Sequence, residues 1–185
     1  GPRVLATFPE ELSSAAAKSL QKLGVEVCLN AKVTDCNEQG IVIGDELIPV
    51  GTIVWAAGVQ ASPAAQWLGV ESDRAGRVKV AADFSVPAHE GVFVIGDTAA
   101  QTDAAGKPVP GVAQGAIQGG DHVAAIIRAQ ITGSSMPAPF RYRNLGNMAT
   151  IGRYAAVADF SFLRMKGGLA WWLWGAVHIA FLIGF

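Results

Sequence analysis

Hydrophobic residues recur at helical spacing in several stretches of the chain. Leu12, Ala16 and Leu20 lie four positions apart, which places them on one face of a helix. Pro9 occupies a favourable first helical position, and Gly24 ends the stretch. The same reasoning predicts helices at 62–68, at 112–131 and from residue 168 onward.

Short apolar runs predict β-strands between these helices. The clearest is Val92–Ile95, followed directly by Gly96 and Asp97, and such a run is typical of a parallel strand buried on both faces. Thr52–Ala56 predicts a second buried strand, which enters a tight loop at Gly58. Further strands are predicted at 4–7, 25–29, 32–36, 40–43 and 148–157.

Composition and charge exclude some classes of function. Hydrophobic residues make up 51% of the 185 residues and charged residues 16%, which is too apolar for a disordered chain. The net charge of −1 supplies no basic field for nucleic acid. Residues 1–121 hold 8 Lys and Arg against 14 Asp and Glu, whereas residues 122–185 hold 6 against 1. An acidic body with a basic, tryptophan-rich tail indicates contact with a membrane surface.

The cysteines predict neither a disulfide scaffold nor a metal site. Cys28 and Cys36 have the spacing of neither a redox CxxC motif nor a zinc site. With Val27 and Leu29 beside it, Cys28 is predicted to be a small core residue. The chain has no start methionine and stops within an apolar run, so we expect it to be part of a longer protein.

Candidate ligand-binding residues cluster in two places. Asp97, at the end of a predicted strand, is suited to bind ligand hydroxyls, although the same residue type also serves as a turn or cap residue. The predicted helix start at 110–114 offers free N–H groups that stabilise a ring gaining negative charge. Gln114 and Gln118 share a helix face near that start; the alternative is that they are its solvated side.

Four motifs together resemble one enzyme family, the single-subunit type II NADH:quinone oxidoreductases. They lie at 52–59 (TIVWAAGV), 92–98 (VFVIGDT), 110–118 (PGVAQGAIQ) and in the tail at 147–153 and 168–178. The resemblance implies FAD contacts and a quinone pocket. The residues it implies for FAD are Gly58, Gly96, Asp97, Val112, Ala113 and Gln114, and those for quinone are Gln114, Gln118 and Lys166.

The resemblance also implies the fold and its parts. We expect an α/β fold, part of a flavoprotein with two dinucleotide-binding domains, followed by a membrane-associating segment. Residues 1–58 would complete the NADH-binding domain, 59–132 the FAD-binding domain, and 133–185 would form a membrane-associating or dimerisation tail. No Gly-x-Gly-x-x-Gly fingerprint occurs in the sequence, so FAD and NADH would be only partly accommodated and the isolated chain inactive.

In the intact enzyme the resemblance implies electron transfer from NADH through FAD to a membrane quinone. It implies a homodimer that is peripheral on the cytoplasmic face of the cell membrane, with no nucleic acid partner. No side chain is assigned an acid–base role, and no metal is expected. The alternatives are a sulfide:quinone or ferredoxin-type reductase of the same superfamily, and a non-enzymatic membrane-binding or dimerisation module.

The tail itself admits three interpretations. Residues 167–185 contain no Asp, Glu, Lys or Arg, a length and composition that allow a short transmembrane span. Tryptophans crowd one end of this run, and Arg164 and Lys166 flank it, which favours a helix lying in the membrane interface. A buried dimerisation helix is the third possibility.

Overall fold

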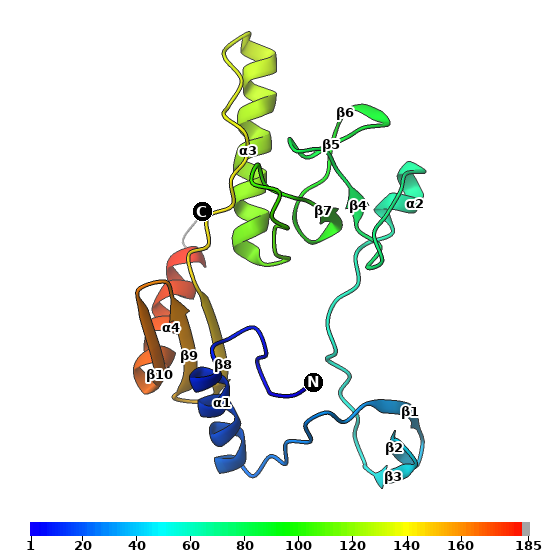
Figure 1. Ribbon diagram of the computed structural model, residues 1–185, viewed down its shortest axis with the longest axis vertical. Coiled ribbons are helices and arrows are strands. Elements are labelled where there is room, and N and C mark those ends of the chain that lie inside the picture. The colour runs from blue at the N-terminus through cyan, green and yellow to red at the C-terminus, as the bar shows by residue number, and fades with distance from the viewer. Residues whose placement is uncertain (183–185) are drawn as a thin grey trace. The chain divides into compact units, whose positions relative to one another are not determined.

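The computed structural model describes residues 1–182 and contains both helices and strands, so the mixed α/β class is confirmed (Figure 1). It divides into two compact units. Unit 1 is Gly1–Ala56 with Leu145–Phe185, and unit 2 is Ala57–Asn144. The assignment of 1–58, 59–132 and 133–185 to three functional parts stays a prediction, and residues 183–185 of the predicted tail lie outside the described residues.

The main sheet of unit 1 has three antiparallel strands between two helices. The sheet order is β10-β9-β8, so neighbouring strands are consecutive in sequence. The elements are α1 (Glu10–Lys22), β8 (Asn147–Gly152), β9 (Ala155–Phe160), β10 (Leu163–Gly167) and α4 (Gly168–Leu182). The predicted helix at 9–23 and the predicted helix from 168 onward are both confirmed.

Side chains alternate along the central strand β9, so successive residues point to opposite faces of the sheet. Each face is covered by a different helix, and both are buried. Val157 packs in one cluster with Leu12 of α1. Ala156 and Ala158 pack in a second cluster with Ala170 of α4. Small alanines on this second face allow α4 to lie close against the sheet. The result is a layer of strands covered by one helix on each side.

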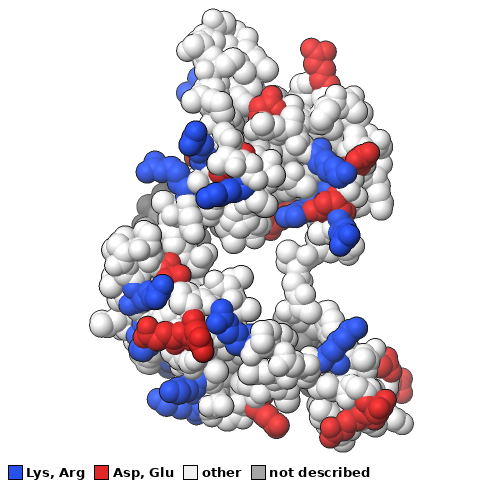
Figure 2. Space-filling model, in the orientation of Figure 1, with Lys and Arg blue, Asp and Glu red and all other residues white. Residues whose placement is uncertain are grey.

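A separate three-stranded meander also belongs to unit 1. It consists of β1 (Val33–Asn37), β2 (Gly40–Ile43) and β3 (Glu46–Pro49), paired antiparallel in chain order, which confirms the strands predicted at 32–36 and 40–43. Gly40 has φ +146, and a Cβ there would stand 2.1 Å from the Ile48 carbonyl oxygen, so only glycine fits. Figure 2 shows acidic side chains gathered over this meander; Asp35, Glu38, Asp45 and Glu46 are exposed on it.

Unit 2 is built around one long helix and several short strands. In chain order it contains α2 (Ala64–Leu68), β4 (Val78–Lys79), β5 (Ser85–Val86), β6 (His89–Phe93), the 3-10 turn η1 (Gly96–Thr98), β7 (Ala99–Ala100) and α3 (Ala113–Thr132). β4 pairs with β7 in parallel, and β5 pairs with β6 antiparallel. The helices predicted at 62–68 and 112–131 are confirmed.

The helix α3 buries one face in unit 2. Its buried residues are Gly115, Gly119, Val123, Ile126 and Ala129. Val123 packs with Phe84 and Phe140 in one hydrophobic cluster. A Cβ on Gly119 would stand 3.0 Å from the Phe84 ring, so the glycine lets this ring lie directly on the helix.

Of the two predicted buried strands, one is absent and the other is a strand only at Val92 and Phe93, which end β6. Thr52–Ala56 is exposed coil, with Val54 83% exposed. Val92–Ile95 is only half-buried at most, and β6 runs from His89 to Phe93 in an antiparallel pair. A doubly buried parallel strand needs hydrogen-bonded neighbours on both sides, and no strand within residues 1–182 pairs with 52–56 or places β6 in a parallel sheet.

Three smaller predictions in the N-terminal part are also wrong. Residues 4–7 form turns, with Leu5 at φ +48. Residues 25–29 form no strand, and Cys28 is exposed rather than part of the core. The apolar neighbours Val25 and Leu29 are exposed as well, so no packed layer of the described residues covers Cys28.

Candidate functional site

The turn after β6 lies directly against the start of α3. Gly96 has φ +65, and a Cβ there would stand 3.2 Å from the Cβ of Ala116. A Cβ on Gly111 would stand 3.3 Å from Asp97 Oδ1. The two glycines therefore allow the Asp97 carboxylate and the backbone that leads into α3 to approach each other closely.

The Asp97 side chain is exposed in the 3-10 turn η1, whose N-cap is Ile95. No described residue donates a hydrogen bond to the Asp97 carboxylate. The next residue, Thr98, forms a side-chain hydrogen bond with Ser62, with 3.2 Å between the two hydroxyl oxygens. The carboxylate thus retains its full capacity to accept hydrogen bonds from hydroxyl groups.

The first turn of α3 carries small and polar side chains. Val112 is the extended N-cap residue and Ala113 begins the helix. Tyr142 Oη donates a long hydrogen bond of 3.5 Å to Gln114 Oε1, and burial raises the pKa of Tyr142. Asp97 therefore lies near the start of α3, the helix whose first turn holds Ala113 and Gln114.

Gln118 is engaged at both ends of its amide. Its Nε2 donates to the Arg143 carbonyl oxygen at 3.0 Å, and its Oε1 accepts from the Arg143 backbone N–H at 2.9 Å. The amide thus makes the pair of backbone hydrogen bonds with Arg143 that a residue of an adjacent strand would make. Gln118 is half-buried, and both interpretations, a residue of the site and a residue of the solvated side of the helix, stay predictions.

The remaining predicted site residues are Gly58 and Lys166. Gly58 lies in exposed coil with φ +108, a conformation that favours glycine. Lys166 lies in unit 1, where its Nζ bonds Glu11 Oε1 at 2.7 Å. The hydrogen bond from Lys166 is the main cause that lowers the pKa of Glu11.

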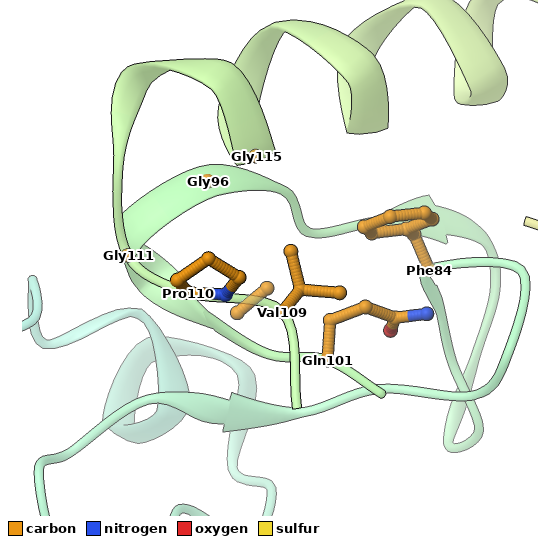
Figure 3. Close-up of a pocket in the computed structure, with 8 residues that line it drawn as sticks. Phe84, Gly96, Gln101, Val109, Pro110, Gly111 and Gly115 are labelled. Atoms are coloured by element: carbon orange, nitrogen blue, oxygen red, sulfur yellow. The ribbon is translucent and has the colours of Figure 1, made fainter. Parts of the chain in front are cut away.

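A small cavity lies beneath the start of α3. One of the residues that line it, Gln101, is not predicted from the sequence. Its lining includes Gln101, Val109 and Pro110 in a row, with Gly96 and Gly115 above them in the view of Figure 3. Gln101 is only 5% exposed. It stands in a polar loop of the sequence, and nothing in the pattern around it signals burial. Tyr142 was missed for a similar reason, because its contact partner is 28 residues away.

No group of three or more His, Cys, Asp or Glu side chains in residues 1–182 is arranged to hold a metal ion. Within the same residues, no helix has the length and hydrophobicity needed to cross a membrane.

Known proteins similar in sequence carry related names. The chain is 45% identical to the type II NADH:quinone oxidoreductase Ndh of Mycobacterium tuberculosis, over 100% of this chain and 41% of that protein. It is 32% identical to a type II NADH:quinone oxidoreductase of Staphylococcus haemolyticus, over 84% of this chain and 40% of that protein. The resemblance inferred from the motifs is confirmed. The chain spans about 41% of the length of the first of these relatives.

A solved structure shares the fold. NDH2 from Plasmodium falciparum, determined in complex with NADH, matches 100% of this chain and 53% of its own with a TM-score of 0.86 and 17% identity. At this identity the match concerns the fold alone.

A family assignment follows from a match that covers more than half of the chain. The sequence model of the pyridine nucleotide-disulphide oxidoreductases matches residues 1–120. This range includes Asp97, Gln101 and the first turn of α3, around which the site is built. The chain belongs to the pyridine nucleotide-disulphide oxidoreductase family.

Proposed function

We propose that this chain is the C-terminal part of an FAD-dependent NADH:quinone oxidoreductase. The observation that carries the proposal is the Asp97 carboxylate beside Gly111 at the start of α3, in a chain 45% identical to a protein with that activity in its name. When FAD is bound, electrons pass from NADH to quinone through its ring system. The residues of this chain bind and orient the ring and hold the quinone.

The residues near Asp97 fit a flavin. The carboxylate is free to accept hydrogen bonds from the ribityl hydroxyls, and Gly96 and Gly111 leave the backbone accessible. Val112, Ala113 and Gln114 present small side chains and a helix N-terminus, whose partial positive charge stabilises negative charge on the ring. Gly58 lies in the exposed coil that precedes Ser62, whose Oγ contacts Thr98 Oγ1.

The quinone side of the proposal involves Gln114, Gln118 and Lys166. Gln118 holds the segment of Tyr142 and Arg143 beside α3. In the proposal this segment forms one side of the quinone site, so Gln118 acts on quinone through it. Gln114 contacts Tyr142 from the first turn. The role of Lys166 rests on the family resemblance, since its printed contact is to Glu11.

We further propose that α4 attaches the enzyme to a membrane surface. Trp172 and Phe181 are 64% and 62% exposed, and the two cations that precede α4, Arg164 and Lys166, are paired with Asp159 and Glu11. Exposed apolar and aromatic side chains on one helix suit the interfacial layer of a membrane. In the same proposal, the intact enzyme is a homodimer that binds the cytoplasmic face of the cell membrane. The isolated chain is expected to lack NADH oxidation, because it carries no glycine-rich dinucleotide fingerprint.

The experiment that tests the FAD site compares two aspartates of unit 2 in the intact enzyme. Asp97→Ala should reduce the FAD retained after dialysis by about tenfold or more, because a hydrogen bond to a charged group contributes about 1.5–3 kcal/mol. Asp121→Ala, on the exposed side of α3, is the matched control and should retain FAD. Full flavin occupancy in Asp97→Ala contradicts the assignment. Equal melting temperatures of the two variants after FAD has been removed from both show that folding is intact.

A further inference from the structure

Gln101 holds its side-chain amide in a fixed orientation inside unit 2. Its Nε2 donates to the carbonyl oxygens of Ala82 at 3.1 Å and Thr102 at 2.8 Å, which uses both amide hydrogens. Its own backbone carbonyl accepts from the N–H of Val109 at 2.9 Å. The residue therefore joins three backbone segments near the start of α3, and the two donor bonds settle which side of the amide is oxygen.

The oxygen of this amide lacks a donor. Gln101 Oε1 is buried and has no hydrogen-bond partner among the described residues. Buried polar atoms nearly always have a partner, which is either a protein group or an ordered water. A glutamine that were present only for its two donor bonds would leave this acceptor uncompensated.

The cavity that Gln101 lines has the size and polarity for one water molecule. It offers about 10 Å³ to the centre of a water-sized sphere, which is close to the minimum for a single water. Because Gly96, Gly111 and Gly115 are among its lining residues, parts of its wall are backbone. The Pro110 carbonyl oxygen lies 2.7 Å from the place where a Cβ on Gly115 would stand. A substantial ligand such as a flavin does not fit in it.

We propose that one buried water molecule occupies this cavity and links Gln101 Oε1 to the backbone that leads into α3. Gln101 is then a positioning residue for the loop that carries Asp97 and Gly111. The water site stands on the cavity and on the amide alone. The consequence for flavin binding rests on the proposed function.

A crystal structure of the intact enzyme at a resolution that shows ordered solvent tests the water site. We expect solvent density within about 2.6–3.2 Å of Gln101 Oε1 and of a backbone polar atom of the loop. A well-ordered cavity without density, or a protein donor on Oε1, overturns the water site. This result does not depend on whether FAD is bound, so it is separate from the proposed function.

The positioning role is tested with Gln101→Met, which keeps the length of the side chain and removes its hydrogen bonds. Gln130→Met, on the exposed side of α3, is the matched control. We expect Gln101→Met to raise the dissociation constant for FAD severalfold at a temperature well below its Tm, while Gln130→Met leaves it unchanged. A folded Gln101→Met enzyme with unchanged FAD affinity overturns the positioning role. If the parent enzyme binds no FAD, the proposed function fails, and the positioning role fails with it, while the crystallographic result still decides the water site.

Discussion

The two helices α3 and α4 show how differently one chain uses apolar surface. In α3 the buried residues form one face, at positions 115, 119, 123, 126 and 129, and polar side chains such as Gln118 lie beside it. In α4 the one buried residue among those described is Ala170. Leu169, Trp172, Ile179, Phe181 and Leu182 are all exposed.

The helix α3 buries its apolar face in the core of unit 2, whereas α4 carries more apolar side chains than the core of unit 1 covers. The face of α3 matches the space left by Phe84 and Phe140. The sheet of unit 1 offers α4 a small patch, in which Ala156 and Ala158 are buried and Met148, Phe160 and Met165 pack around them. Much of the apolar area of α4 has no protein cover among residues 1–182. Exposed apolar area of this extent marks an interaction surface.

The largest expected effect comes from the exposed face of α4. Trp172→Ser with Phe181→Ser should weaken binding of the intact enzyme to anionic liposomes by about 100-fold or more, since each buried large side chain contributes about 1.5–3 kcal/mol. The substitution keeps Ala170 but removes the ring contacts of Trp172 with Trp171 at 5.1 Å and with Tyr154 at 6.4 Å, so the melting temperature of the variant is measured alongside. Liposome flotation measures the effect, and high salt alone should release only part of the wild-type enzyme.

Trp67→Ser is the control for that experiment, because Trp67 is 76% exposed but belongs to unit 2. It should float like the wild type. Full flotation of the double variant would show that the anchor lies elsewhere than α4.

A pair of glycine substitutions tests the packing side of the comparison. Gly119→Ala should lower the free energy of unfolding by about 1–3 kcal/mol, because the new Cβ meets the Phe84 ring at 3.0 Å. Gly175→Ala has open space around it and should raise stability by up to about 1 kcal/mol through helix propensity. Urea unfolding measures both; equal effects of the two changes would contradict the contrast between the helices.

The smallest expected effect concerns the polar side of α3. Gln118→Ala removes both bonds to the Arg143 backbone, each contributing about 0.5–1.5 kcal/mol. We expect reoxidation of the flavin by quinone to slow by about tenfold, with flavin reduction by NADH nearly unchanged. Gln130→Ala serves as its control. Slowing confined to the reduction step would refute the placement of Gln118 on the quinone side.

Local sequence patterns predict the elements whose hydrogen-bond partners lie nearby in the sequence. The α3 and α1 helices follow from spacing, and β1 with β2 follows from two short runs around the Asn37–Gly40 turn, because adjacent strands find each other. Thr52–Ala56 has the same apolar character but requires strands that residues 1–182 do not provide, so the pattern alone gave the wrong structure.

The candidate site divides in the same way. Gln114 lies in the first turn of α3, a helix that the sequence predicts, whereas Asp97 lies in the 3-10 turn η1 and not directly at the end of a buried strand. Gln101 and Tyr142 could not, because their roles depend on contacts with Ala82 and Gln114 that only the folded chain creates. The amide of Gln118 was predicted at the site, but its pairing with the Arg143 backbone was not.

The central claim is tested most directly by following flavin absorbance in the intact enzyme through two successive rapid mixings. The account predicts that NADH bleaches the flavin and that a membrane quinone then restores its colour, both within the time of one steady-state turnover. Bleaching by sulfide but not by NADH would favour the sulfide:quinone alternative. A flavin that NADH reduces but quinone fails to reoxidise, or an enzyme without flavin, would contradict the account.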